Sequence, residues 1–393
     1  LYSWYLRNTE YRSRVQKLVQ SAFAGKPEDI ISQSVAKALY GEVSPYSATR
    51  LERFAACAFA HFLQYGMKLT ERVEYEFKPM DMGNVMHEAL ESFAEEVRKR
   101  GMKWTELTEQ ERNEIADRCL DNIVADYGNT VLKSSARNEY MIERTRRILR
   151  RTVWALQKQL EQGEFQPEGF EVTFGGGRID RVDIMEDQNK VYVKVIDYKT
   201  GNTSFDLVYL YHGLQLQLMI YLDGALRVEQ KKYPDKEIIP AGVFYYNIKD
   251  PMIQEKIDAD VEAVSAGLMK ELKMNGLVQA DPELVYRMDS SLGSIPVAFN
   301  KDGSFRKNSS VADRTQFAVL GRYVRTKIEK IRSSILEGDA EVSPYELGKK
   351  NACTYCPYMT VCGFDRRLSG YEFRRLKNFS DEELWKAFDR EAE

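Results

Sequence analysis

The most constraining feature of the sequence is a predicted β-hairpin that carries an acid and a lysine at one end. Two short runs rich in β-branched residues, 178–185 and 190–198, flank a polar turn at 187–189. Because side chains alternate along a strand, Asp197 and Lys199 point to the same face of the second strand. Burying an acidic and a basic side chain at the end of a strand costs free energy, so the pair is unexpected unless it serves a function. The hairpin therefore predicts a chemically active site on this face.

A second carboxylate, Asp180 on the first strand, can reach the same face. Two neighbouring carboxylates raise each other's pKa unless a cation lies between them, and Mg²⁺ or Mn²⁺ prefers oxygen ligands. Such an ion can polarise a scissile phosphate and activate a water molecule that Lys199 orients. The alternative is a surface salt bridge between Asp197 and Lys199. That pair would be weak and would not account for the apolar strand around it.

This hairpin resembles the signature of the PD-(D/E)XK nuclease superfamily, in which an aspartate and a turn are followed by Asp-x-Lys on the next strand. Here these residues are Asp180, Asp197 and Lys199. Two further segments are similar to motifs of the RecB-type branch of that family. Residues 83–91 match G-x-x-x-H-x-x-x-E, and residues 217–221 match Q-x-x-x-Y. The resemblance implies an α/β fold with a mixed central sheet that is flanked by helices, with helical insertions and a cysteine-bound iron–sulfur clasp.

The resemblance also assigns roles to individual residues. The implied catalytic residues are Asp180, Asp197, Lys199, Gln217 and Tyr221. The implied metal ligands are His87, Asp180 and Asp197. A spacing of four places Gln217 and Tyr221 on one helix face, near the DNA or Lys199, unless they only pack. Asp183 faces away from Asp180, where the family's G-x-(I/V)-D pattern ends, and Glu171 precedes the hairpin where such nucleases often have an acid.

The five cysteines include a dense C-x2-C-x5-C segment formed by Cys353, Cys356 and Cys362. Reduced thiols at this spacing indicate a metal centre rather than a disulfide, and the fourth ligand must be Cys57 or Cys119. Zinc and a [4Fe-4S] cluster both fit four sulfur ligands, so the spacing does not decide between them.

The cysteine pattern resembles the iron–sulfur centre of AddB-type nuclease domains, in which one upstream cysteine joins a terminal C-x2-C-x5-C segment. The resemblance implies a [4Fe-4S] cluster that closes the domain as a structural clasp. Its implied ligands are Cys57, Cys353, Cys356 and Cys362. Ala58 stands where the family usually has proline, so the local turn differs. Cys119 lies in no matching motif and is expected to be a small buried residue.

The chain is expected to divide at residue 40. Residues 1–40 read as the helical tail of a preceding helicase-like region, and residues 41–393 read as a nuclease domain closed by the cluster. Leu1 in place of methionine predicts that the sequence is a segment of a longer polypeptide. Further predicted helices lie near 48–66, from Asp81, and near 107–160, 207–230, 252–274, 311–336 and after Asp381.

The net charge of −3 argues against a protein that coats nucleic acid through bulk charge. Five arginines in a helical pattern either meet a phosphate backbone or form a solvated face balanced by acids. They are Arg144, Arg146, Arg147, Arg150 and Arg151. The sequence contains no run of about 20 apolar residues and no secretory leader. We therefore expect a cytoplasmic protein without membrane association.

AddB-type domains belong to a bacterial helicase–nuclease that processes double-strand breaks. The resemblance implies Mg²⁺-dependent exonucleolytic cleavage of single-stranded DNA from duplex ends, on the 5′-ended strand, in recombinational repair. It also implies an AddA-type helicase–nuclease partner subunit. The iron–sulfur nucleases of CRISPR adaptation are an alternative, although they usually lack the long helical insertion at 100–160. A non-catalytic DNA-binding module and a zinc-bound scaffold are the remaining alternatives.

Overall fold

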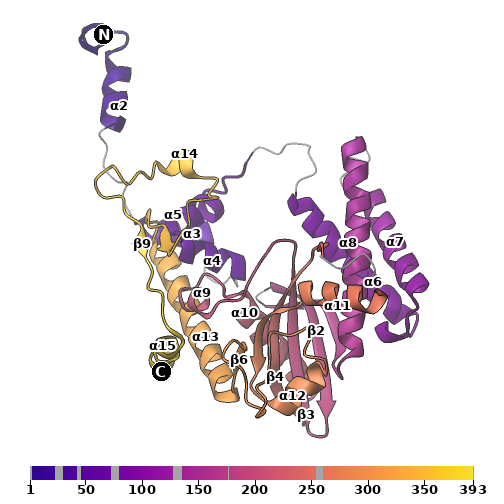
Figure 1. Cartoon of the computed structure of the whole chain (residues 1–393). Coiled ribbons are helices and arrows are strands. Elements are labelled where there is room, and N and C mark those ends of the chain that lie inside the picture. The colour runs from indigo at the N-terminus through magenta and orange to yellow at the C-terminus, as the bar shows by residue number, and fades with distance from the viewer. Residues whose placement is uncertain are drawn as a thin grey trace. The chain divides into compact units, whose positions relative to one another are not determined.

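The computed structural model divides the chain into two compact units. The described residues are 2–22, 30–41, 46–71, 79–126, 135–175, 177–253 and 260–392. The first unit comprises Leu1–Glu71, His212–Leu214 and Lys327–Ser380. The second unit comprises Arg72–Tyr211, Gln215–Thr326 and Asp381–Glu393. Each unit combines helices with a sheet of its own (Figure 1).

The second unit is built on a six-stranded sheet with the strand order β1-β2-β3-β4-β5-β6. Its strands are β1 (Gln166–Phe174), β2 (Gly177–Asp187), β3 (Lys190–Lys199), β4 (Glu237–Asn247), β5 (Asn275–Gln279) and β6 (Val311–Ala312). The pairs β1–β2, β2–β3 and β4–β5 are antiparallel, whereas β3–β4 and β5–β6 are parallel. The expected mixed sheet is therefore confirmed. The predicted hairpin consists of β2 and β3, in which Asp183 lies opposite Lys194.

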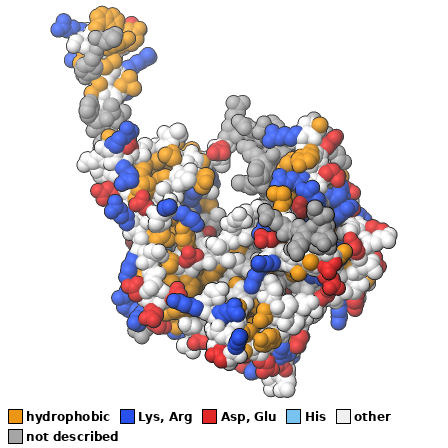
Figure 2. All heavy atoms as spheres, viewed as in Figure 1, with side chains coloured by type: hydrophobic (Ala, Val, Ile, Leu, Met, Phe, Trp, Pro, Cys, Tyr) orange, Lys and Arg blue, Asp and Glu red, His pale blue; other side chains and the backbone are white. Residues whose placement is uncertain are grey.

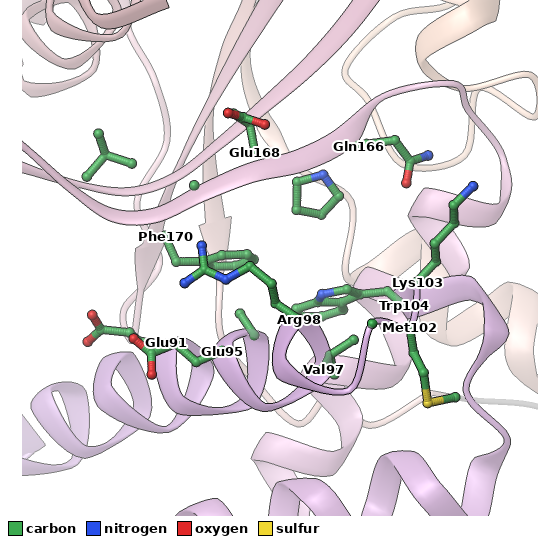
Figure 3. A pocket seen from close by; sticks show the side chains of 15 residues that line it. Glu91, Glu95, Val97, Arg98, Met102, Lys103, Trp104, Gln166, Glu168 and Phe170 are labelled. Carbon is green, nitrogen blue, oxygen red and sulfur yellow. The ribbon is translucent and has the colours of Figure 1, made fainter. Parts of the chain in front are cut away.

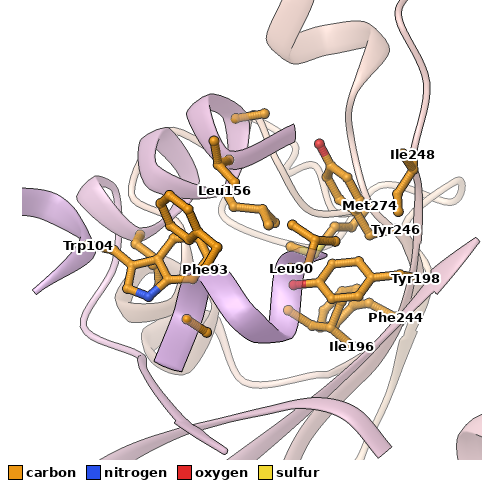
Figure 4. Packing of buried hydrophobic residues seen from close by; sticks show 14 of the residues in the cluster. Leu90, Phe93, Trp104, Leu156, Ile196, Tyr198, Phe244, Tyr246, Ile248 and Met274 are labelled. Atoms are coloured by element: carbon orange, nitrogen blue, oxygen red, sulfur yellow. The ribbon is translucent and has the colours of Figure 1, made fainter. Parts of the chain in front are cut away.

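Helices cover both faces of this sheet. On one face, Phe93 of α6 and Leu156 of α8 belong to the same buried cluster as Tyr198 of β3 (Figure 4). Lys199 follows Tyr198 and hydrogen-bonds to Gln217 of α10, so α10 lies on the opposite face. The helices are α6 (Pro79–Lys99), η2 (Trp104–Glu106), α7 (Glu109–Asp126), α8 (Ala136–Glu161), α9 (Leu207–Tyr211), α10 (Gln217–Lys232), α11 (Val261–Glu271), α12 (Pro282–Met288) and α15 (Asp381–Ala392).

The first unit contains mainly short helices and a three-stranded sheet with the order β8-β7-β9. Its elements are α1 (Tyr2–Arg7), α2 (Arg12–Ala22), α3 (Gln33–Tyr40), α4 (Ala48–Ala56), α5 (Ala58–His61), η1 (Phe62–Gly66), β7 (Tyr345–Leu347), β8 (Lys350–Asn351), α14 (Met359–Cys362) and β9 (Arg374–Arg375). Ser47 caps α4, since its hydroxyl accepts a hydrogen bond from the backbone N–H of Arg50 at 3.3 Å. The extended backbone of Cys57 (φ −167°) interrupts the helix expected at 48–66. Helix α13 (Arg314–Glu337) has residues in both units.

The helix expected at 207–230 is instead two helices, α9 and α10. Gly213, between them, has a φ of 78°, in the left-handed region where a right-handed helix cannot continue. The helix expected at 252–274 ends at Glu271, because the chain then enters β5, a strand that the sequence pattern did not predict. The helix expected near 107–160 includes α7 and α8, and residues 127–134 between them lie outside the described residues. Among those residues, no helix has the length and apolar character required to cross a membrane.

Candidate active site

Lys199 lies at the centre of a chain of polar contacts at the end of β3. Its Nζ is 2.6 Å from Oδ2 of Asp197 and donates a hydrogen bond to Oε1 of Gln217 at 2.7 Å. The side-chain amide of Gln217 donates in turn to the hydroxyl of Tyr221 at 2.9 Å. The Nζ also lies 5.4 Å from the ring centroid of Tyr245. These contacts link four of the predicted catalytic residues and hold the ammonium group at a defined point.

The burial of Asp197 distinguishes this pair from a surface salt bridge. Asp197 is 1% exposed, whereas the side chain of Lys199 is 27% exposed. Burial raises the pKa of Asp197 to about 7, and the negative charge of Asp180 acts in the same direction. The charges of Lys199 and His87 oppose this rise. A carboxyl group with a pKa near neutrality is typical of a functional site.

His87 of α6 faces two carboxylates, one from β1 and one from β2. Its Nδ1 is 3.3 Å from Oδ2 of Asp180 and 3.9 Å from Oε1 of Glu171. The same Asp180 oxygen accepts a hydrogen bond from the backbone N–H of Tyr198 at 2.7 Å. Burial disfavours the charged imidazole, but hydrogen bonds to Asp180 and Glu171 raise the pKa of His87 to about 10. The two carboxylates therefore attract positive charge to the point at which they meet.

These three side chains form a candidate metal site. One ligand atom from each of His87, Glu171 and Asp180 lies within 4.8 Å of the others, and no second group of this kind occurs in the described part of the chain. The two carboxylates supply the oxygen ligands that Mg²⁺ and Mn²⁺ prefer, so the group fits the predicted divalent ion through Glu171 and Asp180. The structure thus brings together two of the three predicted metal ligands. The third, Asp197, lies outside the group and contacts Lys199.

Glu171 is the site residue that the predicted set omits. Its side chain is 6% exposed and forms an ion pair with the exposed Arg178 of β2. Its φ of 49° lies in the left-handed region, which is uncommon for residues other than glycine. Such backbone conformations concentrate at functional sites. The sequence indicates only that an acid precedes the hairpin. A positive φ interrupts the regular alternation of a strand, so alternation does not predict the direction of the Glu171 side chain.

Asp183 lies on the face of the sheet that Asp180 does not share. It is fully buried and forms ion pairs with Arg181 at 2.6 Å and with Lys194 at 3.0 Å. Because Asp183 is engaged by two buried cations, it is not available to the candidate site. Asp180 and Asp183 thus lie on opposite faces of the hairpin, and the role of Asp180 as a metal ligand remains a prediction.

A cavity of about 450 Å³ lies beside the site, between α6 and the edge strand β1 (Figure 3). Glu91, one turn after His87 on α6, lines this cavity. Burial and the charge of Glu171 raise the pKa of Glu91. The stacked rings of Trp104 and Phe170, with centroids 5.8 Å apart, line the same cavity. The acidic side of the site therefore continues into an aromatic surface.

Four cysteines of the first unit line one cavity. They are Cys57, Cys353, Cys356 and Cys362. Burial and the neighbouring thiols raise the pKa of Cys353 to about 12, and burial raises the pKa of Cys57. Although all four residues are described, no three of their sulfur atoms lie within 4.8 Å of one another. Cys119 is buried in α7 of the second unit, and it does not line this cavity.

Comparison with known proteins covers most of the chain. Residues 45–363 match the family model described as the PD-(D/E)XK nuclease superfamily. The chain is 42% identical to the B subunit of the ATP-dependent helicase/deoxyribonuclease of Lachnoclostridium phytofermentans, across 97% of this chain and 35% of the relative. It is 34% identical to proteins of the same name from Thermoanaerobacter sp. (strain X514) and Clostridium acetobutylicum, across 100% of this chain and 36% of each relative. The chain thus spans about a third of the length of these curated relatives.

Proposed function

Because the chain belongs to the PD-(D/E)XK nuclease superfamily, a family of metal-dependent nucleases, we propose that it hydrolyses phosphodiester bonds of single-stranded DNA with Mg²⁺ or Mn²⁺ as its cofactor. The family expected from the sequence is confirmed. The observation that carries the proposed activity is the position of Lys199. It lies 2.6 Å from Asp197, on the strand next to the one that bears Asp180.

We assign the ion to His87, Asp180 and Asp197, with Glu171 as a further ligand. When bound, the ion would polarise the scissile phosphate and lower the pKa of a coordinated water molecule. The contacts of 3.3 and 3.9 Å between His87 and the two carboxylates support His87, Asp180 and Glu171 as ligands. Asp197 is included because the charges of Asp180 and His87 act on its carboxyl group. A divalent ion at this point would supply the positive charge that the two carboxylates attract, and its binding would require His87 to be neutral.

We assign the orientation of the attacking water and the stabilisation of charge on the phosphate to Lys199. Its ammonium group is fixed by Asp197 on one side and by Gln217 on the other. Gln217 is therefore a positioning residue for Lys199, and Tyr221 positions Gln217 through the hydrogen bond of 2.9 Å. Because the ammonium group is already in position, little free energy is spent on reorganising it when charge develops on the phosphate.

We further propose that the chain is part of a helicase–nuclease that processes double-strand breaks, where it acts as an exonuclease on the 5′-ended strand with an AddA-type partner subunit. The relatives are named as subunits of an ATP-dependent helicase/deoxyribonuclease. Their name supports DNA as the substrate and a helicase as the partner. Within this proposal, residues 1–40 are the tail of a helicase-like region and residues 41–393 form the nuclease domain.

Removing the divalent ion is expected to abolish cleavage. Single-stranded DNA labelled at its 5′ or its 3′ end is incubated with the protein and Mg²⁺, with excess EDTA, and with Mg²⁺ restored after EDTA. Because the protein groups bind the ion but cannot replace its positive charge, products should form only with the ion present. Short products released first from the 5′ label would support the proposed polarity. Release first from the 3′ label would contradict the polarity, and cleavage in EDTA would contradict the metal dependence.

We propose that Cys57, Cys353, Cys356 and Cys362 hold a [4Fe-4S] cluster rather than zinc. All four thiols line one cavity of the first unit. Four thiolates fit either zinc or a [4Fe-4S] cluster. The combination of one upstream cysteine with a terminal C-x2-C-x5-C segment resembles AddB-type domains, which supports the iron–sulfur assignment.

The Cys353→Ser variant is expected to lose its iron, because a serine hydroxyl is a poor substitute for a thiolate ligand. Iron, zinc and acid-labile sulfide are measured in protein that is purified without oxygen, and we expect about four iron and four sulfide per wild-type chain. Cys119→Ser is the matched control, since Cys119 is buried away from the cavity, and it should keep the full content. Stoichiometric zinc without sulfide in the wild type would contradict the cluster.

A further inference from the structure

A groove in the second unit is built from elements that carry no residue of the candidate active site. It is bordered by α7, α8 and α11 and has a volume of about 460 Å³, within the range of roughly 300–1,000 Å³ for ligand sites. The residues of the active site come instead from α6, α10 and the strands β1 to β3. In the space-filling view, basic and acidic side chains are interspersed over α7 and α8 (Figure 2).

The arginines that α8 contributes to this groove differ in their ion pairs. Arg147 is paired with Asp250 at 2.6 Å, and Arg150 is paired with an aspartate of α7. Arg151 forms no ion pair with any residue that the structure describes, and its guanidinium carbon lies 5.4 Å from the ring centroid of Trp154. Of the three arginines of this run that line the groove, Arg151 thus remains available to an anionic ligand.

The groove also contains a buried guanidinium group without a carboxylate partner. Arg112 is 6% exposed, its Nη1 donates to Oε1 of Gln157 at 2.7 Å, and its Nε has no hydrogen-bond partner. Within the described ranges, no carboxylate oxygen lies within 4.0 Å of it. Burial lowers the pKa of Arg112, and the more distant charge of Glu109, which also lines the groove, opposes this shift. The buried Arg181, by contrast, is paired with Asp183 at 2.6 Å. Because a buried cation is stable only when it is paired, Arg112 lacks a counterion that an anionic ligand would supply.

Trp154 gives the groove a surface on which a flat ring can stack. It is only partly buried, and it lines the groove together with Val261, Val264 and Leu268 of α11. An aromatic ring beside arginines is the arrangement with which proteins bind single-stranded nucleic acids. A base stacks on the ring, and the guanidinium groups neutralise the adjacent phosphates. The apolar wall and the arginines therefore suit the two parts of a nucleotide.

We propose that this groove is a second binding site for single-stranded DNA. In it, a base stacks on Trp154 while phosphates pair with Arg112 and Arg151. This inference rests on the proposed function, since the groove would bind the substrate strand outside the site of cleavage. A strand that occupies both sites would be bound more tightly than a strand that reaches only one of them, because the second contact is then intramolecular.

The test measures binding without cleavage. The whole chain is titrated in EDTA with fluorescein-labelled oligothymidylates of increasing length, and fluorescence anisotropy gives the affinity at several salt concentrations. Arg151→Glu is compared with Arg144→Glu, the same charge reversal at an exposed arginine of α8 that does not line the groove. We expect Arg151→Glu to weaken the binding of the longer oligonucleotides roughly tenfold and to lower the salt slope by about 0.7 for each lost phosphate contact.

A second variant reports on stacking. Trp154→Phe keeps an aromatic ring, so the affinity should persist while the quenching of tryptophan fluorescence by long oligonucleotides decreases. Equal effects of the two charge reversals would overturn the proposal, as would thymidine monophosphate binding as tight as that of the long oligonucleotide. Binding in EDTA does not depend on cleavage. If the chain binds DNA through Arg151 but does not cut it, the proposed binding site in the groove stands and the proposed nuclease activity is contradicted.

Discussion

Replacing Lys199 with alanine is expected to reduce Mg²⁺-dependent cleavage of single-stranded DNA by roughly a hundred- to a thousandfold while the fold is retained. The side chain is partly exposed, and its ammonium group contacts the carboxylate of Asp197 and the amide of Gln217. Its loss removes the positive charge that faces the developing charge on the phosphate. It also removes one of the two charges that oppose the raised pKa of Asp197, so a higher pH would be needed to ionise this carboxylate.

Lys190→Ala is the matched control for this variant. Lys190 is exposed and begins the same strand that Lys199 ends, so both variants lose one lysine from β3. Initial cleavage rates are measured with end-labelled DNA, and circular dichroism confirms that each variant is folded. Cleavage by Lys199→Ala at the rate of the control would show that this lysine takes no part in the reaction. No cleavage by either the wild type or the Lys190→Ala control would instead favour a module that holds DNA without cutting it.

The hairpin could be predicted because its information is local. A polar turn at 187–189 between two apolar runs fixes the pairing, and alternation then places Asp197 and Lys199 on one face. The spacing of Gln217 and Tyr221 is also local, and the structure places Tyr221 one turn after Gln217 at the start of α10, with Gln217 bonded to Lys199. Patterns of this kind need no knowledge of the rest of the chain.

Features that depend on distant contacts could not be read in the same way. Glu171 reaches His87 through a backbone with positive φ, which no periodicity indicates. Gly213 interrupts an apolar helical pattern that otherwise continues from α9 into α10. The spacing of the terminal cysteines predicts three ligands, whereas the approach of Cys57 to these residues depends on the folded first unit.

The buried ion network on the other face of the hairpin predicts a large loss of stability. Asp183 is fully buried, 2.6 Å from Nε of Arg181 and 3.0 Å from Nζ of Lys194. Burial alone would raise the pKa of Asp183, but the charges of Arg181 and Lys194 lower it overall, so this carboxylate is ionised. Asparagine at this position would leave two buried cations side by side without their counterion.

Asp183→Asn is therefore expected to lower the free energy of unfolding by about 3–5 kcal/mol, as measured by urea unfolding. Asp187→Asn is the control, because Asp187 ends the same strand and forms a partly exposed pair with Arg287 at 2.6 Å, worth about 1 kcal/mol or less. Tryptophan fluorescence can follow the transition, since the Arg181 guanidinium lies 5.6 Å from the ring centroid of Trp104.

A loss of stability no greater than that of the control would mean that aromatic rings, not the carboxylate, stabilise the two cations. Trp104 lies beside Arg181, and Phe165 lies 5.0 Å from Nζ of Lys194, so the experiment distinguishes two real sources of stabilisation. The larger loss is expected because a desolvated cation over an aromatic ring gains about 2 kcal/mol. Removing one partner of a buried ion pair costs more than that. Since Asp183 lies opposite Lys194 in the hairpin, that loss falls on the strand that positions Asp180.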